Sequence, residues 1–161
     1  MSAERQQPGS PAARRGAPAR VLTVTAAQPA ADLAHEVLTA RQCSHRRTGA
    51  TGARVYEFGS RLGDVFLGGA GARLLLRGPL QRLTVHGWVV VHPLAGASPT
   101  LTVAGAQFDP ASGAWVVSVI DAVVAELTRH GLLVDAGEQV SSLELTGSPA
   151  FPQRFRSHRG D

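Results

Sequence analysis

The sequence predicts an α+β domain in which a curved antiparallel sheet of about five to seven short strands is covered by two helices. Three observations lead to this prediction: a nine-residue glycine repeat, a helical segment on each side of it, and strand-like segments at both ends. With 161 residues, the chain is long enough for one hydrophobic core and short for two.

The repeat between residues 56 and 105 is the strongest signal for strands. The glycines in register are Gly69, Gly78, Gly87, Gly96 and Gly105. The positions four and two before each glycine are mostly apolar, as Leu101 and Val103 are, and side chains two apart share one face of a strand. Each unit is therefore predicted to be a short strand that ends at a residue tolerating a positive φ.

Two architectures satisfy this nine-residue strand-turn period. In an antiparallel meander, strands of about five residues alternate with turns of about four. In a short β-solenoid with flanking helices, two units would make one coil of about eighteen residues. The meander is favoured because solenoids usually contain many more coils, and because flanking helices can cover an apolar sheet face. The run VHGWVVVHP, residues 85–93, reads as one longer strand, which would count against the solenoid.

The segment before the repeat is predicted to hold a strand, a helix and a loop. Residues 21–26 alternate apolar and hydroxyl side chains, as a strand does. Residues 29–42 have helical spacing, and Asp32 suits the positive end of a helix. The predicted apolar stripe of this helix is Leu33, Val37 and Ala40. SHRRTGATGA, residues 44–53, is predicted to be a loop.

The segment after the repeat is predicted to hold a helix over 110–130 and a strand over 140–147. Asp109 is the expected N-cap, and Gly131 follows the last turn, where glycine commonly ends a helix. The broad apolar stripe consists of Val116, Val119, Ile120, Val123, Val124 and Leu127. A helix with such a stripe packs against another element.

Charge divides the chain into a nearly neutral domain and two basic tails. Residues 1–20, a predicted disordered tail, hold four Arg against one Glu, and residues 148–161 hold three Arg against Asp161. The predicted domain, 21–147, holds nine Arg and ten acidic residues, for a net charge of −1. A nucleic-acid-binding domain normally has a basic face, so no specific nucleic-acid partner is predicted. All basic residues are Arg, which indicates a GC-rich bacterial genome rather than phosphate recognition.

The sequence predicts a cytoplasmic protein with no membrane partner. Residues 1–20 have no apolar central segment, and the chain has no run of eighteen apolar residues. A single cysteine, Cys43, excludes an internal disulfide. Cys43 and His45 form a Cys-x-His pair, but a zinc site needs further ligands at supporting spacings, so no metal is predicted. Cys43 is interpreted as an inert residue of a loop or helix end.

His92 is the most distinctive candidate for a ligand pocket. It takes a repeat position where other units have Val or Leu, and an imidazole on an apolar face needs a hydrogen-bond partner or a ligand. His86 and Trp88 lie on the same predicted strand, and Tyr56 belongs to the first unit. These four residues are the candidates for a pocket under the helix of 110–130. The alternative is that His92 is a satisfied polar residue at a strand end.

No catalytic residue or cofactor is predicted. The glycine-rich LGGAGARLLLRG lacks the Gly-Lys-Ser/Thr ending of a phosphate loop and precedes a strand rather than a helix. The chain also has no Gly-x-Ser-x-Gly, His-Glu-x-x-His or paired-carboxylate arrangement.

Three functional hypotheses remain open. The first is a non-catalytic module that binds a protein partner or itself, with a homodimer formed through exposed strand edges. The second is a binding protein or enzyme for a hydrophobic small molecule, with its pocket around His92. The third is association of the basic tails with polyanions, which would be salt-sensitive and need no specific site.

Overall fold

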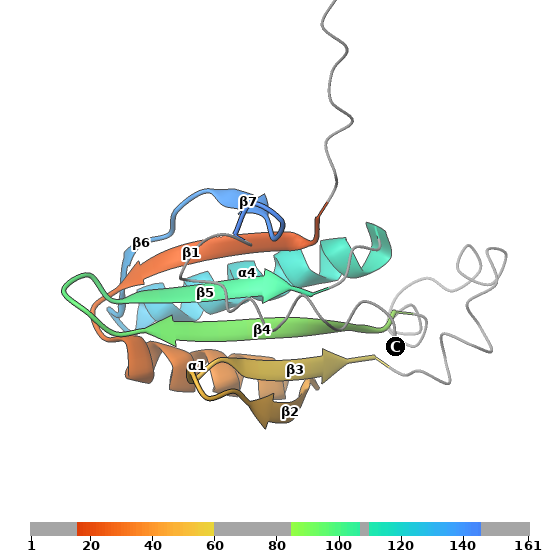
Figure 1. The fold of residues 1–161 in the computed structure, drawn as a ribbon, viewed down its shortest axis with the longest axis horizontal. Helices are drawn as coiled ribbons and strands as arrows, with labels where there is room; N and C mark the ends of the chain where they lie inside the picture. The colour runs from red at the N-terminus through yellow and green to blue at the C-terminus, as the bar shows by residue number, and fades with distance from the viewer. Residues whose placement is uncertain (1–15, 60–84, 107–109, 146–161) are drawn as a thin grey trace, which may run out of the picture.

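The computed structural model describes residues 16–59, 85–106 and 110–145 (Figure 1). In chain order the elements are β1 (Pro18–Val24), α1 (Ala27–Ala40), β2 (Ser44–Thr48), β3 (Arg54–Phe58), β4 (Gly87–Leu94), β5 (Thr100–Gly105), α4 (Pro110–Arg129), β6 (Leu133–Asp135) and β7 (Gln139–Ser141). The predicted α+β class, with a sheet covered by two helices, is confirmed.

The strands form one seven-stranded sheet with the order β2-β3-β4-β5-β1-β6, and β7 pairs with β1 beside β6. All strand pairs are antiparallel. The meander is therefore confirmed and the solenoid alternative is wrong, because stacked coils would pair strands in parallel. The repeat units between residues 60 and 84 lie outside the described residues.

The glycines in register do not all end strands. Gly87 begins β4, which continues without a break to Leu94 and so overrides the nine-residue period. A Cβ at Gly87 would lie 2.6 Å from Cζ of Phe58, its partner on β3. At the end of β5, a Cβ at Gly105 would lie 2.9 Å from Cβ of Ala17. Close packing, rather than a turn, explains both glycines.

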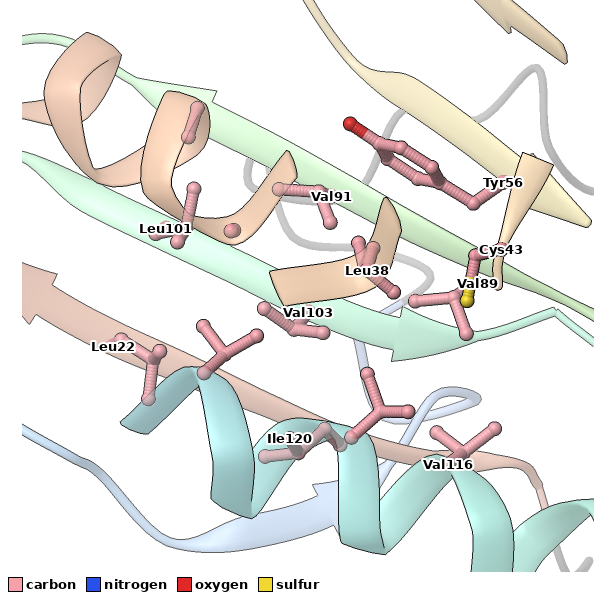
Figure 2. Packing of buried hydrophobic residues seen from close by; sticks show 14 of the residues in the cluster. Leu22, Leu38, Cys43, Tyr56, Val89, Val91, Leu101, Val103, Val116 and Ile120 are labelled. Atoms are coloured by element: carbon pink, nitrogen blue, oxygen red, sulfur yellow. The ribbon is translucent and has the colours of Figure 1, made fainter. Parts of the chain in front are cut away.

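Both helices lie on the same face of the sheet, and the main core fills the space between the helices and the sheet (Figures 1 and 2). Strand side chains facing the helices include Leu22, Tyr56, Val89, Val91, Leu101 and Val103. The predicted stripe of α4 is confirmed in large part, because Val116, Val119, Ile120, Val123 and Leu127 are buried. Val124 packs against the same core and is partly buried. No helix within the described ranges is long and apolar enough to cross a membrane.

The predicted apolar stripe of α1 is wrong, because a different side of the helix faces the core. Its buried residues are Ala27, Ala30, Ala31, Ala34 and Leu38. Leu33 and Val37 only flank the core, and Ala40 is exposed. Alanines face the sheet and α4, and their small side chains suit a close approach. A stripe is predicted mainly from large apolar residues, and in α1 these residues lie at the margin of the buried surface.

Both helices end in the same hydrogen-bonding pattern. Beyond α4, Gly131 has φ +67°, and the N–H of Leu132 donates to the carbonyl of Leu127 at 2.9 Å. This is a Schellman ending, as the predicted glycine stop requires. Beyond α1, Gln42 takes the positive-φ position at 64°, and the N–H of Cys43 donates to Leu38 at 2.9 Å. The turn directs the chain from α1 into β2.

The predicted loop over 44–53 is wrong, because it contains β2 and the turn that joins it to β3. The N–H of Gly49 donates to the carbonyl of Ala53 at 2.7 Å, closing the hairpin. All five residues of β2 are exposed, so the strand has no apolar alternation by which to detect it. Other boundaries differ as well: β1 includes residues 18–20, β6 was not predicted, and β7 spans 139–141.

Candidate functional site

The four predicted pocket residues lie on two faces of the sheet. Tyr56 is fully buried on the helix side, within the main core (Figure 2). Trp88 packs on the other side, beside Ala53, Val55 and Val90. Because successive residues of a strand point to opposite faces, Tyr56 cannot share one pocket with Trp88, its diagonal neighbour across the β3–β4 pair. The structure brings His86 close to Trp88 and separates Tyr56 from both.

His92 lies beside Thr102, its register partner on β5, and both residues are buried. Leu101 and Val103, which the repeat aligns with His92 and Leu94, face the helices instead. The repeat therefore does not define one apolar column, because side chains at the aligned positions of β4 and β5 point to opposite faces of the sheet. The register therefore places His92 on the face away from the helices, outside the main core.

Glu57 is the centre of an ion cluster on the face away from the helices. Its carboxylate accepts hydrogen bonds from Nε2 of His86 at 2.7 Å and from Nε of Arg46 at 2.6 Å. Trp88 packs edge-on to the His86 ring, with a centroid distance of 6.0 Å. Burial acts to raise the pKa of Glu57, but the hydrogen bonds and charges of His86 and Arg46 outweigh it and lower the pKa. Glu57 is therefore held as a carboxylate.

Glu57→Gln is expected to destabilise the protein by about 1 to 2 kcal/mol near neutral pH. Because the pKa of Glu57 is lowered, the native state binds a proton there only at a lower pH than the unfolded chain does. The stabilisation is therefore fully present above about pH 4.3 and is lost as the pH falls through the native pKa. Urea unfolding of both proteins over a pH series should show the difference closing at acid pH.

The matched control is Glu126→Gln, which removes the charge from an exposed pair with Arg129 on α4. It should change stability by less than about 0.5 kcal/mol. A Glu57→Gln penalty that stays constant down to the lowest pH would mean that the carboxylate charge does not provide the stabilisation.

A second cluster surrounds Tyr56 where α1 meets the β2–β3 hairpin. The Tyr56 hydroxyl is 3.0 Å from Nδ1 of His35, and the two form a hydrogen bond. The His45 ring lies 5.4 Å from the Tyr56 ring and 6.0 Å from the His35 ring. Burial raises the pKa of Tyr56, and a hydrogen bond from Arg54 only partly offsets this. Tyr56 therefore stays a neutral phenol at ordinary pH.

Arg54 fastens the hairpin to α1. Its Nη2 donates to Oδ1 of Asp32 at 2.6 Å, and its Nη1 donates to the carbonyl of Ala31 at 3.2 Å. Together with the His35–Tyr56 bond, these contacts hold β3 against α1 at two points. The sequence singled out Tyr56 as a pocket candidate and His45 as half of a Cys-x-His pair, but it did not bring them together with His35 and Arg54.

The β2 edge, meaning the outer edge of Ser44–Thr48, lies at one end of the sheet and consists of exposed residues. Every residue of β2 is exposed, and β2 ends the strand order with β3 as its neighbour (Figure 1). At the opposite end, β1 is paired by both β6 and β7. Among the described strands β6 and β7 end the sheet on that side with three residues each, whereas β2 presents five exposed residues.

The chain segment that contains β2 is rich in arginine. Residues 41–54 contain four Arg and no acidic residue. Arg46 forms an ion pair with Glu57, Arg54 forms one with Asp32, and Arg41 donates a hydrogen bond to Ser118 on α4. The net charge of −1 over residues 21–147 concealed this concentration, because the acidic residues lie elsewhere along the chain.

Cys43 is buried between the end of α1 and the start of β2, with its sulfur beside Val89 (Figure 2). Burial raises its pKa to about 12, although the charge of Arg41 acts in the opposite direction. The thiol is therefore protonated at neutral pH and is a poor nucleophile. Within the described parts of the chain, no group of three or more His, Cys, Asp or Glu side chains is arranged to hold a metal ion.

Comparisons with known proteins assign no family. No protein-family model matches the chain. No curated protein matches it either. The geometry of the described residues is therefore the basis for assigning a function.

Proposed function

We propose that this domain is a non-catalytic, cytoplasmic protein-interaction module, and that its docking element is the β2 edge. The observation that carries the proposal is that all five residues of a terminal strand are exposed. The unpaired N–H and C=O groups of an edge strand are a template for pairing with another chain. Several classes of interaction domain bind an extended peptide in this way.

The hydrogen-bonding pattern of the hairpin indicates which groups face outward. Gly49 and Ala53 form a hydrogen-bonded pair, and bonded and non-bonded pairs alternate along an antiparallel ladder. Thr48, opposite Arg54, is the next position and is therefore non-bonded. Its N–H and C=O face away from β3 and supply one donor and one acceptor to an added strand.

Preorganisation of the hairpin supports a docking role. The Arg46–Glu57 ion pair joins β2 to β3 on one face of the hairpin, and the Arg54–Asp32 ion pair joins β3 to α1 on the other, at 2.6 Å each. A platform that is already ordered loses little conformational entropy when a peptide binds. By contrast, the small-molecule alternative has less support, because Tyr56 lies on the opposite face of the sheet from Trp88.

Selection of peptides from a random display library against the purified protein tests this function. Selected peptides are expected to bind Thr48→Pro at least about tenfold more weakly, because proline removes the outward N–H of an edge position that otherwise tolerates it. Thr48→Val, which keeps the N–H, is the matched control and should bind as the unaltered protein does. Thermal unfolding of both variants verifies that they are folded.

Two results would overturn the proposal. One is a set of selected peptides that bind Thr48→Pro and the unaltered protein equally well. The other is a selection that returns no peptide with affinity for the unaltered protein.

A further inference from the structure

We infer that the outer face of the sheet, meaning the face away from the helices, is a docking surface whose occupant is the chain's own C-terminal segment, residues 146–161. The inference does not depend on the proposed function, because the outer face and the β2 edge are different surfaces. It is carried by a row of buried residues, by the position of Leu145, and by the length and composition of the segment that follows.

The row of buried residues crosses four strands of the outer face. Its members are Ala19 on β1, Ala104 on β5, Val90 on β4 and Val55 on β3, and each is the register partner of the next. All four are at most 5 % exposed. Both helices pack on the opposite face of the sheet (Figure 1). Since no helix within the described ranges covers the row, its burial indicates that another segment lies over it.

The neighbouring row indicates that this segment is apolar where it meets the sheet. Thr102 and His92 are register partners next to Ala104 and Val90, and both are buried. The buried hydroxyl of Thr102 has no hydrogen-bond partner. A polar side chain or a water molecule over it would supply one, so we expect apolar atoms to cover it.

Leu145 shows where the covering of the row begins. Its side chain is buried and packs against Ala19 and Ala104, the first two members of the row. Neighbouring strands are about 4.8 Å apart, so the row from β1 to β3 is about 14 Å long. An extended chain advances about 3.3 Å per residue, so roughly five residues beyond Leu145 reach Val55. The sixteen residues 146–161 are therefore long enough to cross the row.

The C-terminal segment has the composition that such a surface requires. Phe151 and Phe155 are its large apolar residues, and phenylalanine buries a large apolar area when it packs. Phe151 is the sixth residue after Leu145, which puts Val90 within its reach. Prolines at 149 and 152 disfavour a helical conformation of the residues before them, as a segment that crosses the sheet in extended form requires.

The contacts of Leu145 favour residues 146–161 over residues 60–84 as the occupant. Residues 60–84 leave β3 and return to β4 beside the Phe58–Gly87 pair. The row begins on β1, two strands away from β4, and there Leu145 already packs on it.

The test compares valine methyl resonances, measured by NMR, in the unaltered full chain and in a variant with both Phe151→Ser and Phe155→Ser. An aromatic ring displaces the resonance of a methyl group that it contacts, so the methyl resonances of Val55 and Val90 are expected to move. Val116 and Val123 lie on α4 in the main core, and their resonances should move several-fold less. These two valines also verify that the variant is folded.

The matched control variant carries Arg154→Ser and Arg156→Ser, which alter the same segment without removing an apolar side chain. It should leave the resonances of Val55 and Val90 in place. A synthetic peptide of residues 146–161 is expected to restore both resonances in the phenylalanine variant. The peptide should bind that variant at least about tenfold more tightly than the unaltered protein, in which the tethered segment competes at a high effective concentration.

Three results would overturn the inference. The first is that the phenylalanine variant leaves the resonances of Val55 and Val90 unchanged. The second is that Phe66→Ser moves them and the phenylalanine variant does not, which would make residues 60–84 the occupant. The third is that they move with protein concentration in the unaltered chain, which would make a second copy the occupant. Each of these results leaves the docking function of the β2 edge standing.

Discussion

Replacing Gly59 with alanine is expected to destabilise the protein by about 3 kcal/mol or more, the largest effect among its glycines. Gly59 follows β3 with φ +78°, a conformation that residues with a Cβ adopt at a cost. The added Cβ would also collide with the carbonyl oxygen of Val85, which is backbone and cannot rotate away. Strain and collision would therefore add. Urea unfolding gives the free-energy change directly.

Substitutions at two other glycines measure the cost of backbone strain separately from the cost of the steric collision. Gly131 also has a positive φ, +67°, but nothing lies within 4 Å of its added Cβ, so Gly131→Ala should cost about 1 to 2 kcal/mol. Gly113 lies within α4, and its added Cβ would be 3.8 Å from Cδ of Pro18, an ordinary contact. Gly113→Ala should stabilise by about 0.5 to 1 kcal/mol. A Gly59→Ala penalty no larger than that of Gly131→Ala would contradict the packing of Gly59 against Val85.

Ile120→Ala is expected to destabilise the protein by about 2 to 5 kcal/mol, because it leaves a cavity at the centre of the α4 stripe. Ile120 is fully buried between α4 and the sheet (Figure 2). The matched control is Val134→Ala, a truncation of another β-branched residue that is 63 % exposed on β6. The control should change stability by less than about 0.5 kcal/mol.

Equal and small effects of these two truncations would contradict the packing of α4 on the sheet. The comparison is informative because both changes remove only methyl and methylene groups. Their expected difference comes from burial and not from charge or hydrogen bonding.

The sequence predicted those parts of the fold in which apolar periodicity and burial coincide. The stripe of α4 repeats at helical spacing over about three turns, and Gly131 ends the helix by its positive φ. The run of residues 85–93 was interpreted as one longer strand that overrides the repeat, and β4 spans Gly87–Leu94. In such segments the local pattern and the tertiary environment favour the same structure.

The sequence failed where tertiary contacts, rather than apolar patterning, decide the local structure. β2 is an exposed edge strand with polar side chains. It forms a strand because β3 provides hydrogen-bond partners and because the turn after α1, at Gln42 and Cys43, directs the chain alongside β3. α1 buries alanines because close helix packing selects small residues. Neither outcome is visible in a periodicity of large apolar residues.

The site could be predicted only in fragments. Glu57 and His86 are 29 residues apart, and they meet because β3 and β4 pair in a specific register. His35 and Tyr56 meet because α1 packs next to the hairpin. The hypothesis of polyanion binding by the tails concerns residues 1–20 and 148–161, which lie outside the described residues except for 16–20, and it stays a prediction.

The central claim is that the outward backbone groups of β2 are unpaired in the free protein and pair on binding. Amide hydrogen exchange at Thr48, measured by NMR with and without a peptide selected for binding to the protein, tests it most directly. The account predicts fast exchange at Thr48 in the free protein, slower exchange at Arg47, whose N–H faces β3, and protection of Thr48 when the peptide is bound. A Thr48 amide that exchanges slowly without peptide, or whose exchange the bound peptide leaves unchanged, would contradict it.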